Sequence, residues 1–205
     1  MRNVFFSLII VLSSFLSISA KADSAKNRWY TLVGGGVSVV PDKRLVSGTL
    51  TYDTGVSGRI GIGYLPEPWD SESATVRLEM ELGYHRYKIS NSTSRHNFGT
   101  AMANIYYDFN ISDMFRPYVG AGGGITSGSL SDSGVLGETE MVDNKLAWQL
   151  MGGISYYPPN LSQFSFDVGY RYLNLGSMEY WVLGNTARIS NLQAHNAEVS
   201  FRYHF

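Results

Sequence analysis

Apolar and polar residues alternate with a period of two in eight segments of this sequence, and this pattern constrains the fold more than any other feature. Within residues 74–85, one set consists of Ala74, Val76, Leu78, Met80, Leu82 and Tyr84, and the other of Thr75, Arg77, Glu79, Glu81, Gly83 and His85. Successive side chains of a β-strand point to opposite faces, whereas a helix would mix the two sets. The pattern predicts strands at residues 29–39, 56–64, 74–85, 99–109, 117–125, 146–156, 164–172 and 196–205.

The connections between these segments alternate in length. Short ones are expected at residues 66–73, 110–115 and 158–163, and longer ones at residues 40–51, 88–97, 127–144 and 174–193. Aromatic residues also gather at segment ends on the apolar face, as in the interfacial girdle of a membrane barrel: Trp29, Tyr64, Tyr107, Phe109, Tyr156, Phe164, Tyr203 and Phe205. A soluble β-sandwich could alternate too, but it explains neither observation. We therefore expect an all-β, eight-stranded antiparallel transmembrane β-barrel with short periplasmic turns and four longer extracellular loops.

The first 22 residues have the features of a secretory signal peptide. Arg2 precedes an apolar run at residues 4–18, and the motif Ala20, Lys21, Ala22 comes directly before Asp23. The run is shorter than a membrane-spanning helix requires, which favours cleavage over an N-terminal anchor. The sequence has no Cys that could carry a lipid. We expect residues 1–22 to be removed and residues 23–205 to form a barrel in the outer membrane of a Gram-negative bacterium.

The charge balance argues against one class of partner. Without Arg2 and Lys21, 14 basic residues face 17 acidic ones, which gives a net charge of −3. Proteins that bind nucleic acid carry a basic footprint instead, so we expect no nucleic-acid partner. A content of 14% aromatic and 16% charged residues suits a membrane barrel better than a soluble helical domain.

In a barrel, the polar set of each alternating segment faces the interior. Apart from histidines, the ionisable residues in these positions are Arg59, Arg77, Glu79, Glu81, Asp108, Asp167, Arg171, Glu198 and Arg202. An eight-stranded barrel is just wide enough for side chains to fill it, so we expect these groups to neutralise one another in a lumen charge network. Simple hairpin registers place Arg59 opposite Glu79, Arg202 opposite Asp167 and Arg171 opposite Glu198. Ion selectivity or proton relay is the alternative interpretation of the same residues.

Three motifs resemble a known family: RPYVGAGGG at residues 116–124, DVGYRYLNLG at 167–176 and VSFRYHF at 199–205. They are similar to the small opacity-protein-like outer-membrane β-barrels, relatives of the membrane domain of outer-membrane protein A. The resemblance implies insertion by the outer-membrane assembly machinery, with Phe201, Tyr203 and Phe205 as the assembly signal. Because the sequence ends at Phe205, we expect no periplasmic peptidoglycan-binding domain such as some relatives carry.

The histidines give no sign of catalysis. Lipid A deacylases among the small outer-membrane barrels present a His and a Ser two residues apart on one strand. His85, His195 and His204 have no Ser at that spacing. His96 has Ser94, but both residues fall in the connection expected at residues 88–97 and not on a predicted strand. We expect no enzymatic activity, with His85 and His204 inside the barrel beside carboxylates and the other two at loop edges. No metal or cofactor is expected, because no His, Asp and Glu cluster has ligand-like spacing. The loop acids are interpreted as a solvated face, with divalent cations or basic partners as the alternative: Asp132, Glu138, Glu140 and Asp143.

The last long loop contains an apolar patch whose candidate contact residues are Tyr180, Trp181 and Leu183. It could be a recognition surface or could pack within the loops. The leading functional hypothesis is a membrane-stabilising scaffold that displays its loops as an adhesin or surface antigen. The alternative is a small porin or solute channel, favoured if the Gly-rich segment 117–125 leaves a file of water. A carrier of apolar molecules and a lipid-modifying enzyme are less favoured hypotheses. The expected partners of this monomeric protein are outer-membrane lipid and lipopolysaccharide, the assembly machinery, and a host or surface ligand.

Overall fold

The computed structural model describes residues 28–45, 48–88, 90, 95–131, 138–139, 145–176, 178–182, 185–189 and 192–205. The expected signal peptide, residues 1–22, lies outside this part of the chain and stays a prediction. The described residues form eight long strands: β1 (Trp29–Val39), β4 (Gly55–Tyr64), β5 (Ala74–Lys88), β6 (Arg95–Phe109), β7 (Phe115–Ser131), β9 (Lys145–Tyr156), β10 (Phe164–Asn174) and β13 (Gln193–His204). The 3-10 turn η1 (Glu67–Trp69) lies between β4 and β5.

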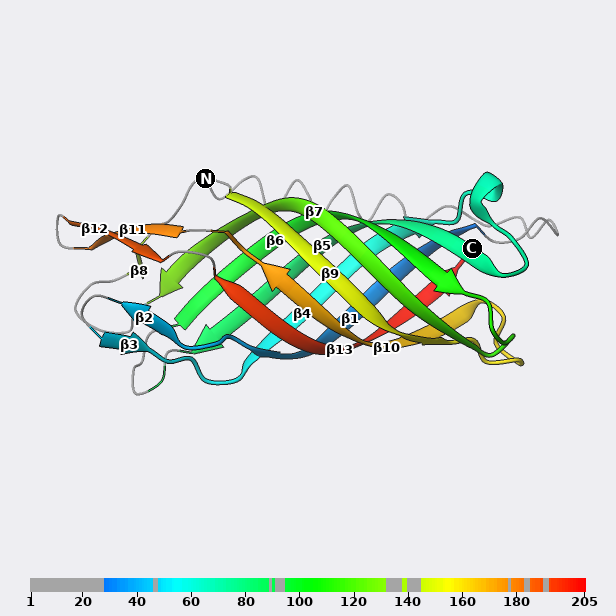
Figure 1. Cartoon of the computed structure of the whole chain (residues 1–205), viewed down its shortest axis with the longest axis horizontal. Helices are drawn as coiled ribbons and strands as arrows, with labels where there is room; N and C mark the ends of the chain where they lie inside the picture. Colours follow the sequence, from blue (N-terminus) through cyan, green and yellow to red (C-terminus); the bar gives the residue numbers. More distant parts are fainter. Residues whose placement is uncertain are drawn as a thin grey trace.

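These strands close into an eight-stranded antiparallel β-barrel (Figure 1). Each long strand pairs with its neighbour in sequence, and β1 pairs with β13 from Tyr30↔His204 to Val39↔His195. The Phe205 amide adds a hydrogen bond of 2.9 Å to the Trp29 carbonyl oxygen. The predicted fold class is therefore confirmed, and β1 has the bounds that the alternation predicts.

The two ends of the barrel differ in their connections (Figure 1). The short-turn end carries residues 65–73, 110–114 and 157–163, together with Trp29 and Phe205. The long-loop end carries a two-stranded sheet of β2 (Lys43–Leu45) and β3 (Gly48–Leu50), the short β8 (Glu138–Thr139), and a hairpin of β11 (Met178–Val182) and β12 (Asn185–Ile189).

Several strands continue further toward the long-loop end than predicted. Residues 86–88 and 95–98 were expected outside the strands, but the β5–β6 ladder extends to Lys88↔Arg95. On the other side of β6, the ladder with β7 extends to Arg95↔Ser131. The strands pair beyond the strictly alternating segments because backbone hydrogen bonding does not require an apolar face. The barrel wall therefore rises past the apolar band.

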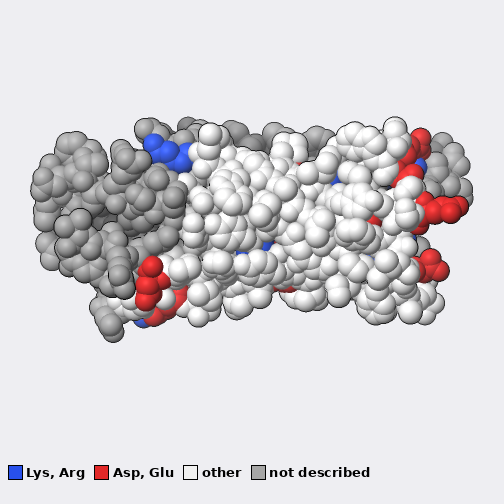
Figure 2. Space-filling model, viewed as in Figure 1, with Lys and Arg blue, Asp and Glu red and all other residues white. Residues whose placement is uncertain are grey.

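The outer wall of the barrel is apolar. Met80 is 67% exposed and Leu146 83%, and Val33 and Val168 are likewise exposed on the same face of their strands. Figure 2 shows charged residues gathered at the two ends of the barrel on this face, with a band between them that is nearly free of charge. An apolar exterior over a polar interior reverses the arrangement of a soluble protein and fits a lipid environment. Within the part of the chain that is described, no helix is long and apolar enough to cross a membrane.

Aromatic side chains surround the short-turn end. The rings of Trp29 and Tyr64 lie 4.8 Å apart, and those of Tyr107 and Phe109 lie 5.0 Å apart. This is the position of an interfacial girdle, because indole and phenol rings favour the boundary between hydrocarbon and water.

Candidate functional site in the barrel interior

All nine residues predicted for the lumen network point into the barrel. None of their side chains is more than 9% exposed: Arg59, Arg77, Glu79, Glu81, Asp108, Asp167, Arg171, Glu198 and Arg202. They come from β4, β5, β6, β10 and β13, so the interior is built from residues far apart in the sequence.

Arg171 of β10 lies at the centre of the network. Its guanidinium donates to both oxygens of Glu198, at 3.1 Å each, and to both oxygens of Glu81, at 2.5 and 3.2 Å. A further hydrogen bond of 2.6 Å goes to Gln149 Oε1. All five donors of the guanidinium fork are thereby used, which is the arrangement that a planar Arg side chain can provide and a Lys cannot.

Arg59 of β4 links this centre to a third carboxylate. Its Nη1 lies 3.3 Å from Glu79 Oε1 and 3.2 Å from Glu81 Oε2, and its Nη2 lies 3.3 Å from Glu198 Oε1. The Tyr30 hydroxyl donates to the other oxygen of Glu79 at 2.9 Å. Buried charges are costly unless they are paired and hydrogen-bonded. Both Arg59 and Glu79 are paired, while Arg59 Nε has no hydrogen-bond partner among the described residues.

The hairpin registers predicted from the sequence are wrong, although the predicted partners meet. Arg59 faces Gly83 across the ladder rather than Glu79. On the other side, Asp167 faces Ser200 and Arg171 faces Asn196. Barrel strands tilt against the axis, so side chains at one height are displaced along the ladder, and a long Arg reaches the displaced carboxylate.

A second group of ion pairs lies nearer the short-turn end. Arg77 Nε lies 2.6 Å from Asp108 Oδ2, and Arg202 Nη2 donates to Asp167 Oδ1 at 2.7 Å. The Arg77 guanidinium also stacks 4.4 Å from the centre of the Tyr106 ring. Each carboxylate here has a guanidinium partner, as a closed interior requires.

Arg116 of β7 is an interior base that the sequence analysis missed. It pairs in the ladder with the buried Ser155, and its guanidinium lies 4.6 Å from the centre of the Tyr157 ring. It was not found because the predicted strand began one residue later, at Pro117. With Arg116 added, five interior arginines match five interior carboxylates.

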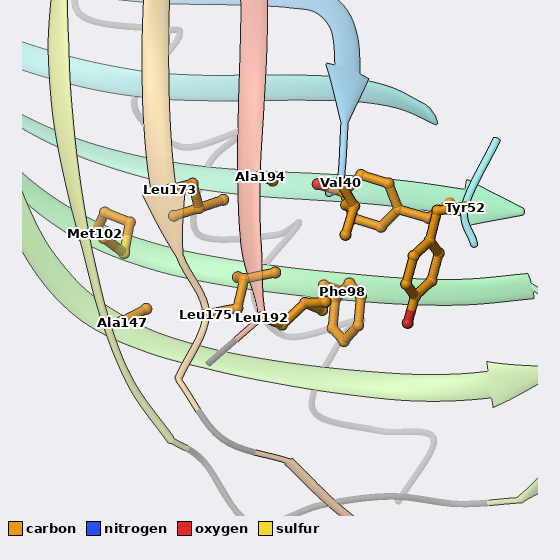
Figure 3. Close-up of a cluster of buried hydrophobic side chains, with 10 residues drawn as sticks. Val40, Tyr52, Phe98, Met102, Ala147, Leu173, Leu175, Leu192 and Ala194 are labelled. Carbon is orange, nitrogen blue, oxygen red and sulfur yellow. The ribbon is translucent and has the colours of Figure 1, made fainter. Parts of the chain in front are cut away.

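The long-loop end of the interior contains an apolar cluster, which the sequence analysis did not predict. Ten buried residues form one cluster there: Val40, Tyr52, Tyr87, Phe98, Met102, Ala147, Leu173, Leu175, Leu192 and Ala194. Figure 3 shows nine of them labelled, with side chains from several strands meeting in the space that the wall encloses. The phase of the period-two alternation could have revealed these residues. Leu173 follows Arg171 by two residues, and Tyr87 follows His85 by two, so both side chains point inward.

The glycines of β7 do not leave a water file. A Cβ on Gly120 would collide with the Tyr106 ring, and one on Gly122 would collide with the Asn104 side chain. These glycines make room for bulky neighbours in the interior. Among the described residues, a small cavity of about 10 Å³ lies beside Arg59, His85 and Arg171, with room for about one water molecule.

Two of the four histidines, His204 and His96, have surroundings that a search along single strands does not suggest. Ser165 Oγ and His204 Nε2 lie 2.9 Å apart across β10 and β13, a Ser–His contact that spacing in one strand could not reveal. Both residues are buried in the interior. His96, expected at a loop edge, is buried with its ring 5.6 Å from that of Tyr52. Within the described ranges, no group of three or more His, Cys, Asp or Glu side chains is arranged to hold a metal ion.

The other predicted site residues lie on the wall and in the loops. Phe201, Tyr203 and Phe205 are half-buried at the end of β13, where Phe201 and Tyr203 both contact the Phe164 ring. Tyr180 and Trp181 belong to β11, but their side chains, like all of Leu183, lie outside the described part of the structure. The loop acids Asp132, Glu140 and Asp143 and the Glu138 side chain also lie outside it.

Comparison with known proteins connects this architecture to a family. The model for the outer membrane protein beta-barrel domain matches residues 8–205. Outer membrane protein PagN of Salmonella typhimurium (strain LT2) is 27% identical over 212 residues, covering 87% of this chain and 86% of PagN.

Solved structures of outer-membrane barrels share the fold. Neisserial surface protein A has a TM-score of 0.60 at 20% identity, covering 86% of this chain and 97% of that one. OprG from Pseudomonas aeruginosa has a TM-score of 0.53 at 11% identity, covering 88% and 98%. At these identities the likeness concerns the fold, which is that of a small outer-membrane barrel.

Proposed function

The chain belongs to the outer membrane protein beta-barrel domain family and is a surface protein of the Gram-negative outer membrane, and from that premise we propose that it acts as a closed, membrane-stabilising scaffold that displays its long loops as an adhesin or surface antigen. The loops at β2–β3, β8 and β11–β12 lie at the end opposite the short turns. In outer-membrane barrels short turns are periplasmic, so the long-loop end faces the outside of the cell.

The filled interior carries this proposal. Paired charges occupy the middle of the barrel, and the apolar cluster occupies its long-loop end. Because side chains fill the lumen, other molecules can contact only the outer surface of the protein. On rigid scaffolds, the residues that bind partners lie mainly in loops.

Deleting loops tests the proposal. A variant without residues 132–144 and 177–191 should keep the barrel while a non-adherent Gram-negative host strain that expresses it loses attachment to epithelial monolayers. Heat-dependent gel mobility reports whether the barrel has folded. A folded, surface-exposed variant that adheres as well as wild type would remove the loops from the function.

A small channel is the second candidate, and the cavity beside Arg59 and Arg171 is the observation that favours it. Single-channel recording of the refolded protein in a planar bilayer separates the two. A silent wild type agrees with the scaffold. Steady currents that change in Arg59→Ala and Arg171→Ala would instead establish a channel through the charge network.

We also propose that the protein is not an enzyme. The Ser165–His204 contact lies inside the barrel, where lipid on the outer wall does not reach it. A Ser165→Ala variant should leave the lipid A of the expressing strain unchanged in mass; a difference from wild type in acyl-chain content would contradict the proposal.

Export and assembly complete the proposal. Residues 1–22 act as the cleaved signal peptide, residues 23–205 form the monomeric barrel, and Phe201, Tyr203 and Phe205 serve as the signal for the assembly machinery. Deleting Phe205 should reduce the amount of folded protein in the outer membrane, whereas refolding of the purified chain in detergent should be nearly unchanged. Equal losses in both settings would assign Phe205 to stability alone.

A further inference from the structure

Three basic side chains face outward at the long-loop end of β5 and β6: Arg86, Lys88 and Arg95. We call them the rim cation cluster. The ladder pairs Lys88 with Arg95 and Arg86 with Asn97, so the three charges lie on adjacent strands within two residues of one another. All three residues are exposed.

Among the described side chains, an ion pair screens one of these charges. Lys88 Nζ lies 3.8 Å from Asp53 Oδ2, and both side chains are about half exposed. Within the described ranges, neither Arg86 nor Arg95 has an ion-pair partner. Two guanidinium groups and a partly screened ammonium therefore face outward together.

The height of the cluster on the wall points to the membrane surface. The outward residues of β5 below it are apolar, from Val76 to Tyr84, and Tyr84 is 53% exposed. At about 3.3 Å per residue and a tilt of about 40°, the ten residues from Val76 to Arg86 rise about 25 Å along the barrel axis. This matches the height of the apolar band of an outer-membrane barrel, about 25 Å, and places Arg86 at the outer headgroup layer.

The short-turn rim differs in its exposed charges. They are mostly acidic, including Glu67, Glu72 and Asp113. Figure 2 shows acidic residues at both ends of the visible face. Arg28 is a basic residue at this short-turn rim, and its Nε pairs with Glu67 Oε1 at 2.9 Å. The cluster is therefore specific to the outer side and not a general property of both rims.

We propose that Arg86, Lys88 and Arg95 form a binding site for the phosphate groups of the glycolipid in the outer leaflet. Guanidinium groups bind phosphate oxygens in a bidentate manner, and basic side chains at a membrane surface attract anionic headgroups. Just below the cluster, the Tyr84 hydroxyl donates to Asn97 Oδ1 at 3.1 Å, which orients the Asn97 amide beside it. The apolar wall under the cluster accommodates the acyl chains of the same lipid.

The site is tested by titrating the refolded full-length barrel in detergent with lipid A and following the complex by native mass spectrometry. The variants are Arg86→Gln, Lys88→Gln, Arg95→Gln and the triple substitution, with Arg28→Gln as the control that removes a charge from the opposite rim. Each removed cation should weaken binding about five-fold, and the triple variant about 100-fold. Heat-dependent gel mobility identifies the folded preparations.

The lipid source is tested with three further probes. Lipid A without phosphates should bind wild type about as weakly as intact lipid A binds the triple variant. Inorganic phosphate in excess should not displace lipid A, and a sulfated polysaccharide should bind wild type and the triple variant equally. The lipid assignment would be overturned if free phosphate displaced lipid A. It would also be overturned if the polysaccharide bound more tightly than lipid A and this binding depended on the rim cation cluster.

Unchanged lipid A binding by the folded triple variant, or an equal loss in Arg28→Gln, would overturn the site itself. The inference goes beyond the scaffold proposal, because it concerns the wall and not the loops. The variant without residues 132–144 and 177–191 keeps all three cations and should bind lipid A as wild type does, so failure of one proposal leaves the other testable.

Discussion

The middle of the barrel and its long-loop end are both filled, but by opposite chemistry. In the middle, Arg171 holds Glu81 and Glu198 through charged hydrogen bonds. At the long-loop end, Leu173, only two residues further along the same strand, is fully buried in an apolar cluster. One strand thus contributes to both regions.

The two regions therefore place different requirements on their side chains. A buried ion network depends on the direction and number of hydrogen bonds, because every charge left without a partner is destabilising. An apolar cluster depends mainly on volume, and it tolerates exchanges that preserve it. The middle should therefore be sensitive to chemistry and the long-loop end to size.

The largest effect is expected from Arg171→Ala. The substitution leaves Glu81 and Glu198 short of a cation, and breaking a buried pair in this way is destabilising by about 3–5 kcal/mol. Urea unfolding in lipid vesicles, followed by tryptophan fluorescence, measures the change. The double variant Arg171→Met with Glu198→Gln should recover part of the loss, whereas a single substitution costing under about 1 kcal/mol would show that water replaces the guanidinium without penalty.

Leu173→Ala should have the next largest effect. Its side chain is fully buried among Leu175, Leu192 and their neighbours, and removing it leaves a cavity. Leu→Ala substitutions in packed cores are destabilising by about 2–5 kcal/mol, and we expect about 3 kcal/mol in the same unfolding experiment. Leu161→Ala, in an exposed turn, serves as the control and should change the free energy of unfolding by less than about 0.5 kcal/mol. Similar values for the two variants would mean that the cluster is loosely packed.

The two regions also differ in how much of their structure the sequence predicts. Alternation predicted the strands and the inward set, because it depends only on which face a side chain occupies. It could not predict register: Arg59 meets Glu79 through strand tilt, although the ladder places Gly83 opposite it. Nor did it reveal that the inward set turns apolar at Leu173, because period-two patterning identifies a face and not the height at which its chemistry changes.

Conservative exchanges should separate the two regions with smaller effects. Arg171→Lys keeps the charge but loses the planar fork that holds both carboxylates, and we expect a loss of about 2 kcal/mol. Leu173→Met nearly preserves volume and should cost less than about 1.5 kcal/mol. The same unfolding assay ranks them. If Leu173→Met proved the more damaging of the two, the distinction between directional and volumetric packing would fail.

The smallest effect is expected at the periplasmic rim, where Arg28 and Glu67 form an ion pair of 2.9 Å that resembles those of the interior in distance but not in burial. The Glu67 side chain is 71% exposed, so water and salt screen the pair, and such pairs contribute at most about 1 kcal/mol. Glu67→Gln should therefore shift the unfolding free energy by no more than about 0.5 kcal/mol, and by less at high salt. A loss close to that of Arg171→Ala would mean that the number of ion pairs, rather than their removal from water, governs the stability of this barrel. The structure favours removal from water, because only the interior carboxylates lose hydration when the barrel closes around them.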